Sequence, residues 1–236
     1  MNQPLAINQI ISYREMCNLE EQEQLQRGMN FGMGGSYSVI LMSVKSNAPY
    51  ADRISEDGLT ICYEGHDVPG DKLKQFDQPV ANPSGTLSQN GLFQFAIDKA
   101  RKDGNYPLVR VYEKLQTGIW NYRGLFELRD YEYVQRGGRK VFEFVLNVTD
   151  QDIKVAEEHD PSHKTIDLEQ TRQIPGRVKL EVFKRDKGQC VQCGSKDNLH
   201  FDHILPYSLG GTSLKTENIQ LLCARHNLQK SNSLVR

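Results

Sequence analysis

The sequence predicts an α+β protein in which a β-rich region precedes a short C-terminal region stabilised by metal. Short runs of β-forming residues separated by turn residues fill the stretch from 30 to 148. One helical stretch, at about 89–102, interrupts them. Closely spaced pairs of Cys and His lie in the last sixty or so residues, a segment of about the size that cannot bury a sizeable core by itself.

The elements of the β-rich region follow from its local patterns. Residues from about 10 to 27 are rich in Glu and Gln, with apolar residues at helical intervals, which predicts a short helix. The expected strands are 37–42, 59–63, 108–112, 119–122, 125–128 and 141–148. Together they predict a compact β-barrel or sandwich with one or two helices, and Trp120 is expected in its core.

Length and composition set the class of protein. The chain has 236 residues and a formal net charge of -1, which gives room for two modest domains. It contains no apolar run long enough to span a membrane and no secretory signal at its N-terminus, so a cytoplasmic protein is expected. Cys17 and Cys62 have no partner at useful spacing and are expected to be buried thiols.

The charge is distributed unevenly along the chain. Residues 172–236 hold eleven Lys and Arg against five Asp and Glu, a net charge of +6, which leaves -7 for the remainder. A basic region of this kind can neutralise phosphates and gives affinity for nucleic acid that does not depend on sequence. The candidate phosphate-binding residues are Lys184, Arg185, Lys187, Arg225 and Lys230.

Two pairs of metal ligands stand in the basic region. Cys190 and Cys193 are separated by two residues, and so are Cys223 and His226. Thiolate and imidazole ligands at this spacing suit tetrahedral zinc, and four protein ligands leave no open position for chemistry. A structural zinc ion is therefore predicted. In the alternative, His226 binds a second metal, and three cysteines with an outside ligand hold the zinc.

A second set of polar residues remains once the zinc ligands are removed: Asp202, His203, Asn218 and Asn227. A His can act as a general base on water, and a hard divalent cation prefers carboxylate and amide oxygens. From about Arg177 to the C-terminus, the pattern resembles the HNH (ββα-metal) endonuclease family.

This resemblance implies a role for each residue of the set. His203 would activate the attacking water, while Asp202 and Asn227 would hold a catalytic Mg²⁺ or Mn²⁺. Asn218 would brace the loop and orient the His, and Gly210-Gly211 would form the turn between the two strands. The stretch after Asn218 would begin the helix that carries Cys223, His226 and Asn227.

The alternative for this region is a zinc knuckle without catalysis. It requires the zinc ligands and the Asp-His…Asn…Asn set to coincide by chance in one short segment, so the catalytic interpretation is favoured. His200, two residues before Asp202 on a predicted strand, would share a face with it. We expect His200 to be a surface residue.

The order of the motifs in the β-rich region gives more information than its pattern of strands and turns. The pieces are Gly35-Ser36-Tyr37-Ser38-Val39-Ile40-Leu41, Pro49-Tyr50-Ala51-Asp52, Asp57-Gly58-Leu59-Thr60-Ile61-Cys62-Tyr63-Glu64-Gly65, Asp77-Gln78, Gln89-Asn90-Gly91, Val109-Arg110-Val111-Tyr112 and Tyr122-Arg123-Gly124-Leu125-Phe126. In this order they resemble the SRA (YDG) domain over most of residues 30–148. The resemblance implies a domain that flips a modified cytosine out of duplex DNA and reads 5-methylcytosine or 5-hydroxymethylcytosine.

The SRA resemblance also implies a base pocket. Tyr50 and Tyr63 match the stacking positions, and Asp52 is the candidate acceptor for the cytosine amino group, since an ionised carboxylate only accepts hydrogen bonds. The sequence departs from the family at Glu64, where a Thr usually follows the Tyr, and at Arg123, which makes the YDG signature YRG.

The two resemblances combine into one hypothesis. An N-terminal helical segment (1–29), an SRA-like reader domain (30–150) and a polar linker (151–176) precede an HNH domain (177–236). The protein would be a modification-dependent restriction endonuclease. It would act on double-stranded DNA as a homodimer, because each chain carries one active site. The alternatives are an HNH nuclease that reads unmodified sequence and a non-catalytic binder of modified DNA.

Overall fold

The computed structural model describes residues 5–25, 28–33, 37–45, 48–55, 59–68, 74–149, 174–206 and 209–233. The predicted linker up to residue 173 lies outside these ranges, as do Gly35-Ser36 and Asp57-Gly58. Within them, no helix is both long and apolar enough to cross a membrane.

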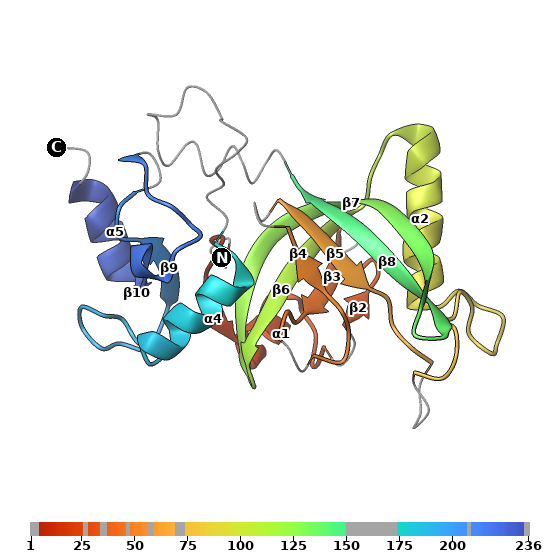
Figure 1. Ribbon diagram of the computed structural model, residues 1–236, viewed down its shortest axis with the longest axis horizontal. Coiled ribbons are helices and arrows are strands. Elements are labelled where there is room, and N and C mark those ends of the chain that lie inside the picture. Colours follow the sequence, from red (N-terminus) through yellow and green to blue (C-terminus); the bar gives the residue numbers. More distant parts are fainter. Residues whose placement is uncertain are drawn as a thin grey trace.

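Eight strands form one curved sheet that makes up most of the molecule (Figure 1). Its order is β2 (Met29–Asn30), β3 (Tyr37–Met42), β6 (Leu108–Gln116), β7 (Ile119–Arg136), β8 (Arg139–Val148), β5 (Thr60–Glu64) and β4 (Arg53–Ile54), and β1 (Ile10–Ser12) pairs with β7. Strands β3 and β6 are parallel, whereas the other pairs are antiparallel. With its helices, this sheet confirms the predicted α+β class.

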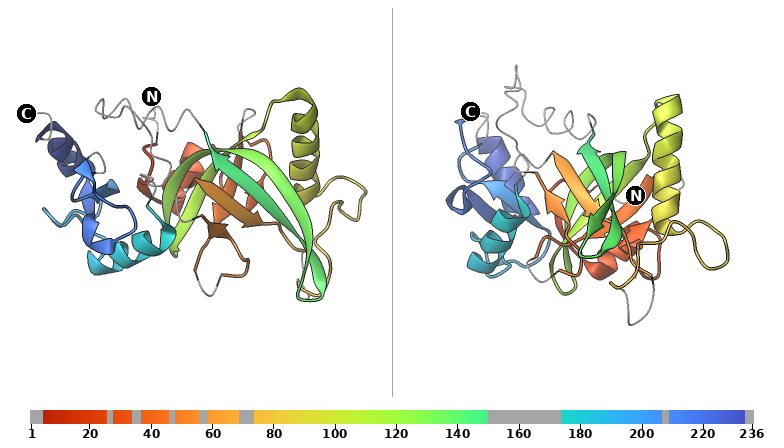
Figure 2. Two further views of the ribbon diagram at one scale, coloured as in Figure 1. Left: turned by 45° about the horizontal axis from the view of Figure 1, so that its top comes forward. Right: turned by 45° about the vertical axis from the view of Figure 1, so that its right-hand side comes forward.

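The long hairpin of β7 and β8 was only partly predicted. The sequence indicated separate runs at 119–122 and 125–128, but one strand continues to Arg136. Gly137 and Gly138, with φ angles of 56° and 85°, make the two-residue turn that returns the chain to Arg139. The tip of this hairpin therefore extends past the neighbouring strands (Figure 2).

Two helices accompany the sheet. Helix α1 (Tyr13–Leu19) begins at Ser12, which forms a capping box with Glu15. It is shorter than the predicted helix at 10–27, because Ile10–Ser12 pair with β7 as a strand. Helix α2 (Gln89–Asp103) was predicted almost to its ends; it begins after Ser88 and ends at Gly104 in the left-handed conformation.

The core of the sheet is continuous and apolar. The central cluster takes Phe93 and Ile97 from α2 together with Tyr63 and the inward residues of β3, β6, β7 and β8. Trp120 is buried in a neighbouring cluster with α1, as predicted. Cys17 and Cys62 are free thiols, the first buried and the second half-buried.

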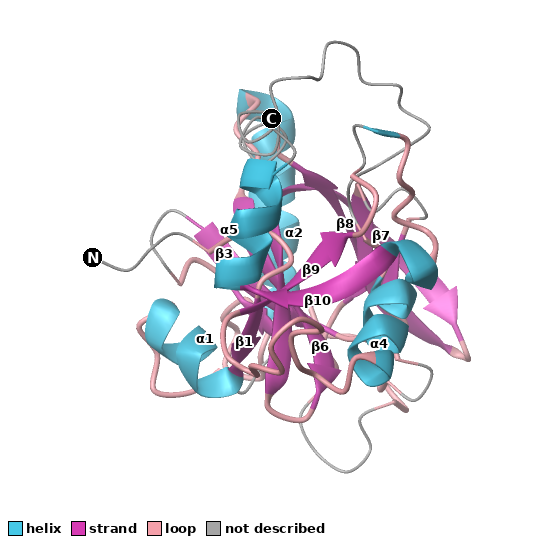
Figure 3. Cartoon of the chain, turned by 90° about the vertical axis from the view of Figure 1, so that its left-hand side faces the viewer, coloured by secondary structure: helices cyan, strands magenta, loops and turns pink. Residues whose placement is uncertain are grey.

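The C-terminal region lies at the end of the molecule opposite α2 (Figure 1). It consists of α4 (Gly176–Arg185), β9 (Leu199–His203), the 3₁₀ turn η2 (Thr216–Asn218), β10 (Ile219–Cys223) and α5 (Ala224–Ser233). Strands β9 and β10 pair antiparallel, with α5 and α4 beside them (Figure 3).

The sequence prediction for the stretch after Asn218 is wrong. It forms β10 rather than the start of the helix, because Ile219, Leu221 and Leu222 are all buried and complete the pairing with β9. Helix α5 starts only after Cys223. Cys223 therefore stands at the end of a strand, and His226 and Asn227 stand in the helix that follows.

Candidate nuclease site and base pocket

The four predicted zinc ligands come together at the end of β10. The sulfur atoms of Cys190, Cys193 and Cys223 and a ring nitrogen of His226 all lie within 4.8 Å of one another. Cys193 Sγ lies 3.8 Å from Cys223 Sγ, which is the ligand separation that a tetrahedral ion at roughly 2.3 Å requires, about 3.8 Å. The donor set and its spacing therefore fit zinc.

Local structure explains why these ligands converge. The Gly194 N–H donates to the Cys190 carbonyl over 2.8 Å, and Gly194 has a φ of 72°, so the first pair stands on a tight turn. Burial raises the pKa of the Cys190 thiol, but nearby backbone N–H groups and His226 more than compensate and lower that pKa to about 6. A thiol that ionises readily is suited to bind metal.

The position of His226 favours the zinc assignment over the alternative. Its Nδ1 lies 3.3 Å from Cys190 Sγ and 3.4 Å from Cys223 Sγ, so the imidazole belongs to the cysteine cluster. The exposed Arg225 guanidinium lies 3.2 Å from the other ring nitrogen. His226 is itself 8% exposed, as expected for a structural ligand rather than a group that meets substrate.

Asp202 is a residue of β9, and its side chain contacts Lys230 of α5. Its Oδ2 accepts from Lys230 Nζ over 2.5 Å and from Gln220 Nε2 over 3.2 Å. Lys230 Nζ also donates to the His203 carbonyl oxygen. Lys230, predicted to bind phosphate, is thus an internal counter-ion of the Asp202 carboxylate in this structure.

His203 occupies the last position of β9, half-buried at the start of the loop. Its Nε2 lies 2.8 Å from the hydroxyl oxygen of Ser213, which is 2% exposed. The sequence analysis did not find Ser213, because a Ser two residues after a double glycine is common in loops. A buried hydroxyl at this distance fixes the orientation of the imidazole.

Asn218 holds the loop between β9 and β10 closed. Its Oδ1 accepts from the Leu205 N–H over 2.8 Å, and its Nδ2 donates to the carbonyls of Leu205 and Thr212 over 3.1 and 3.0 Å. A Cβ on Gly211 would collide with the Leu205 carbonyl oxygen, so only glycine fits beside this brace. These contacts are those of a bracing residue.

The donors available for a catalytic metal are hard oxygens. Asn227 lies three residues before Lys230 on α5, and residues at this spacing share a helix face. Lys230 contacts Asp202, and Asn227 is half-buried. Asp202 and Asn227 thus fit a divalent cation such as Mg²⁺ or Mn²⁺. His200, also half-buried, has its pKa lowered by burial, while Asp202 opposes that shift.

The predicted base-pocket residues are brought together by β4 and β5. The pairs Arg53 with Cys62 and Ile54 with Ile61 place the segment before β4 against the end of β5. Asp52 there accepts from the backbone N–H groups of Ser43 and Glu64, each over 3.1 Å. Burial nevertheless raises the pKa of Asp52 to about 7.

The two tyrosines of the predicted pocket differ in burial. Tyr63 is 2% exposed within the central core cluster, and its hydroxyl stands where a Cβ on Gly28 would be. Tyr50 is half-buried, and Lys74 Nζ lies 5.6 Å from the centroid of its ring. Tyr50 thus offers the more accessible aromatic face.

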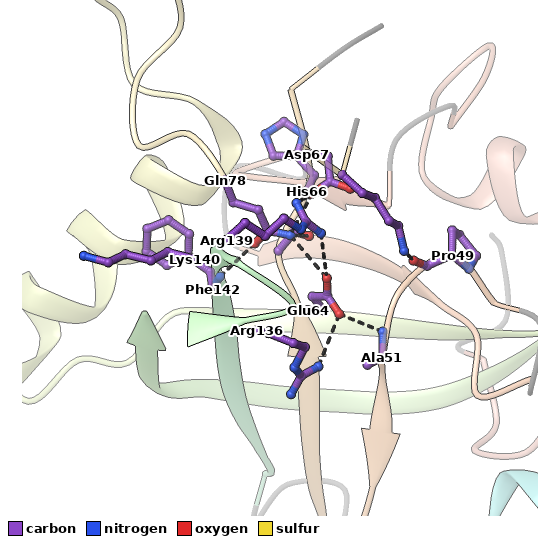
Figure 4. Close-up of polar contacts among 12 residues, drawn as sticks. Pro49, Ala51, Glu64, His66, Asp67, Gln78, Arg136, Arg139, Lys140 and Phe142 are labelled. Carbon is purple, nitrogen blue, oxygen red and sulfur yellow. Dashed lines mark hydrogen bonds and ion pairs between the residues drawn. The ribbon is translucent and has the colours of Figure 1, made fainter. Parts of the chain in front are cut away.

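Glu64 does not point freely into a pocket. Its Oε2 accepts from the Ala51 N–H over 2.9 Å, and it pairs with Arg136 and Arg139 over 3.4 Å each (Figure 4). Arg136 also pairs with Glu143, and Arg53 pairs with the same carboxylate. Glu64 therefore belongs to an ionic network that joins β5 to the hairpin tip.

Asp67, a candidate DNA-facing loop residue on the basis of the sequence, is instead buried in the same ionic network. Its carboxylate is 2% exposed and pairs with Arg139, and its Oδ1 accepts from Gln78 Nε2 over 3.1 Å. Its Oδ2 is buried without a hydrogen-bond partner among the described residues. Burial, and then the charge of the Asp67 carboxylate, raises the pKa of Tyr50.

A local signal could have identified part of this network. Arg136 and Arg139 flank a double glycine, the pattern of a hairpin tip with two guanidinium groups side by side. The sequence does not reveal that the hairpin tip folds back onto Glu64 and Asp67. Arg139 pairs with both carboxylates, and each of them lies more than seventy residues before it in the chain. That contact depends on the length of β7.

Comparisons with known proteins match one segment to a family model and the chain to several solved structures. Residues 190–233 match the family model described as HNH endonuclease. Solved structures that are similar to this chain include the SRA domain of SUVH5 with hemimethylated CG DNA, at 20% identity over 63% of this chain and 92% of that chain with a TM-score of 0.45. The same domain with fully hydroxymethylated CG DNA matches at 19% identity over the same shares, with a TM-score of 0.46. No curated protein sequence matches the chain.

Another similar structure is Arabidopsis thaliana SUVH6 in complex with SAM, at 19% identity over 66% of this chain and 30% of that chain, with a TM-score of 0.41. The described residues thus define an α+β protein. Its C-terminal part matches the HNH endonuclease model over residues 190–233 and contains a Cys and His cluster that can bind zinc.

Proposed function

We propose that this protein is a modification-dependent DNA endonuclease, in which the N-terminal domain reads a modified cytosine and the HNH domain cuts the DNA. The observation that carries the proposal is the second polar set beside the zinc cluster. Asp202, His203 and Asn218 are each held by named partners in the segment that matches the HNH model. A zinc knuckle that served only as a platform would not need them.

The nuclease residues would divide the work. His203, oriented by Ser213, would take the proton from the attacking water, and Asn218 would keep the loop in place. Asp202 and Asn227 would hold a divalent metal, which when bound would stabilise charge on the phosphate and the leaving oxygen. Arg225, with the exposed Lys184 and Lys187, would neutralise neighbouring phosphates.

The base pocket would lie around Tyr50 and Asp52. A flipped base must regain the stacking and hydrogen bonds that it loses, a cost of about a few kcal/mol. Tyr50 would supply an aromatic face and Asp52 an acceptor for the N4 amino group, with Tyr63 supporting the pocket from the core. Glu64 would act through its ion pairs rather than by touching the base.

Asp67 favours 5-hydroxymethylcytosine over 5-methylcytosine as the preferred base. A hydroxymethyl group brings a hydrogen-bond donor, whereas a methyl group brings none. The Asp67 Oδ2 is a buried acceptor without a hydrogen-bond partner among the described residues, and the charge of this carboxylate contributes to the raised pKa of Tyr50. A donor on the ligand would satisfy this buried oxygen.

The protein would act on double-stranded DNA as a homodimer, in the cytoplasm, where it would serve in restriction. Each chain has one HNH site, and cutting both strands at one locus requires two. The reader domain is proposed to span 30–150, with the linker at 151–176 and the HNH domain at 177–236.

The test compares plasmid DNA that carries cytosine, 5-methylcytosine or 5-hydroxymethylcytosine in buffer with Mg²⁺ or Mn²⁺. We expect cutting of modified DNA, fastest for the hydroxymethylated plasmid. His203→Ala should abolish cutting while binding to DNA remains. If the wild-type protein and the His203→Ala protein both bind modified DNA and neither cuts it, the protein is a non-catalytic binder. Asp52→Ala should remove the preference for modified DNA, with the exposed Asp130→Asn as its control. Equal cutting of all three plasmids would identify a nuclease without modification dependence.

A further inference from the structure

The reader sheet and the nuclease domain share one apolar cluster. Ile10 and Leu115 of the sheet pack with Val178 and Val182 of α4 and with Phe201 of β9, and all five are buried. Gln9 also forms an isolated β-bridge with His200, and the Phe201 N–H faces the Asn8 carbonyl at 3.5 Å. The two regions therefore meet through a packed interface.

A lysine is buried inside this interface. Lys179 of α4 is 0% exposed, and its Nζ lies 6.0 Å from the centroid of the Phe201 ring. With the Asn121 amide oriented so that its oxygen faces α4, Lys179 Nζ donates to that oxygen over 2.8 Å, and the amide nitrogen donates to the Asn8 carbonyl over 3.2 Å. Burial, and then the Arg123 guanidinium, lowers the pKa of Lys179 well below its usual range.

An arginine of the sheet is buried beside this lysine. Arg123, the residue that changes the YDG signature to YRG, is 0% exposed. Its Nη1 donates to the Ile174 carbonyl over 2.8 Å and lies 3.5 Å from Glu113 Oε2. Ile174 lies two residues before the start of α4, so Arg123 fixes the point where the chain enters the nuclease domain.

Gly176 completes the contact from the side of the nuclease. A Cβ at this position would collide with the Glu113 carboxylate, so the first residue of α4 lies directly against the ion pair. The buried joint is thus formed by Arg123, Glu113 and Asn121 from the sheet and by Gly176 and Lys179 from α4.

A buried polar joint of this kind reduces the stability of the interface but fixes the arrangement of the sheet and α4. The Glu113 carboxylate pairs with Arg123, and the Nε and Nη2 of Arg123 lack hydrogen-bond partners among the described residues. Apolar residues would hold the surfaces together at least as well, because burying charges is expensive. Buried polar groups instead demand one arrangement in which their hydrogen bonds are made.

We propose that this joint sets the register between base pocket and nuclease site, and thereby fixes how far from the modified base the DNA is cut. The inference rests on the proposed function for its consequence in DNA cleavage. Lys179, Arg123 and Glu113 are positioning residues, since they act through the placement of α4 and β9.

The experiment maps the cut positions of the full-length protein on a duplex with a single 5-hydroxymethylcytosine. The wild-type protein should cut within one narrow cluster of positions. Lys179→Met, which keeps most of the side-chain volume, and Glu113→Gln should each widen that cluster by about twofold or more, because a loosened joint samples more positions. Lys196→Met, at an exposed position of the nuclease domain, is the matched control and should cut as the wild type does.

A distance measurement without DNA tests the rigidity of the joint independently of DNA cleavage. Spin labels on unnatural amino acids that replace the exposed Phe95 and Leu228 report the distance between α2 and α5. This distance should be narrowly distributed in the wild type and broad in both joint variants, with zinc content unchanged. Wild-type cut positions and a narrow distribution in both variants would overturn the inference. If no DNA is cut at all, the proposed function fails, and the distance distribution alone decides whether the joint holds the two regions.

Discussion

The nuclease site and the base pocket are built in opposite ways. The zinc ligands lie within residues 190–226, and the neighbouring polar set lies within 202–227, so each is contained in one short segment. The pocket network instead joins residues 51–67, Gln78 and the hairpin tip at 136–143. A site of the first kind can be recognised from spacing, whereas a site of the second kind exists only once a long strand has folded back.

The two sites also differ in what holds them together. The nuclease site needs an ion to join three sulfur atoms and an imidazole that are otherwise only neighbours. The pocket already contains its own counter-charges, because Arg136 and Arg139 meet Glu64, Asp67 and Glu143. Removing the metal should therefore damage one site and leave the other, and removing an arginine should do the reverse.

The largest effect is expected from loss of the zinc cluster. Cys190→Ser should unfold the nuclease domain, since a structural zinc ion contributes on the order of 10 kcal/mol to the folding of a small site. Hydrogen exchange should show loss of protection in β9, β10 and α5, with protection of β6 to β8 retained. Cys62→Ser is the control, because this thiol lies only near Glu143. Retained protection in the Cys190→Ser protein would rule out a structural zinc ion.

A smaller effect is expected at the hairpin tip. Arg139→Met leaves the Glu64 and Asp67 carboxylates buried without their common partner and should cost about 3 kcal/mol of unfolding free energy. Arg129→Met, which breaks a pair with Glu127 that is about two-fifths exposed, should cost at most about 1 kcal/mol. Denaturant unfolding of the two variants measures this difference. Equal losses would show that the pocket network adds nothing beyond a surface ion pair.

These differences explain what could be predicted from the sequence. The zinc ligands and Asn218 were identified because metal chemistry and a loop brace impose residue types at fixed short spacings. Helix α2 was found because a capping Ser and a terminal Gly mark its ends. The long β7 was missed because its second half is half-buried or exposed and rich in charged residues.

The errors have the same physical origin. Residues 10–12 and 219–223 were both expected in or near helices, yet each forms a strand because tertiary pairing overrides local preference. The sequence analysis noted Arg123 only as a departure from a signature, and its burial against α4 depends on how two distant regions dock. Glu64 was expected at the base edge, and its two arginine partners lie more than seventy positions away.

The pocket, unlike the zinc site, should respond to pH near neutrality. The pKa of Asp52 is raised to about 7 by burial, so its carboxylate is ionised above this pH and protonated below it. Only the ionised form is purely an acceptor for the cytosine amino group, so affinity for modified DNA should fall by up to about tenfold per pH unit as the pH drops below about 7. Fluorescence anisotropy between pH 8 and pH 6 measures the effect, with Asp52→Asn expected to bind weakly at every pH. Tighter binding at pH 6 would show that the protonated Asp52 donates a hydrogen bond to the base instead.

The smallest effect is expected at Lys230, where the nuclease site also contains an internal counter-charge. Its ammonium group lies 2.5 Å from Asp202 Oδ2, and both side chains are about one-fifth exposed. A divalent cation must displace this ammonium group to reach the carboxylate. Because a partly exposed ion pair contributes about 1 kcal/mol, the Lys230→Gln protein should bind Mn²⁺ about fivefold more tightly than the wild type. Titration of Mn²⁺ into DNA-free protein gives the affinity, and Lys196→Gln is the matched control. Unchanged or weaker Mn²⁺ binding would mean that Lys230 does not compete with the metal for Asp202, and that its contact with the His203 carbonyl is its main role.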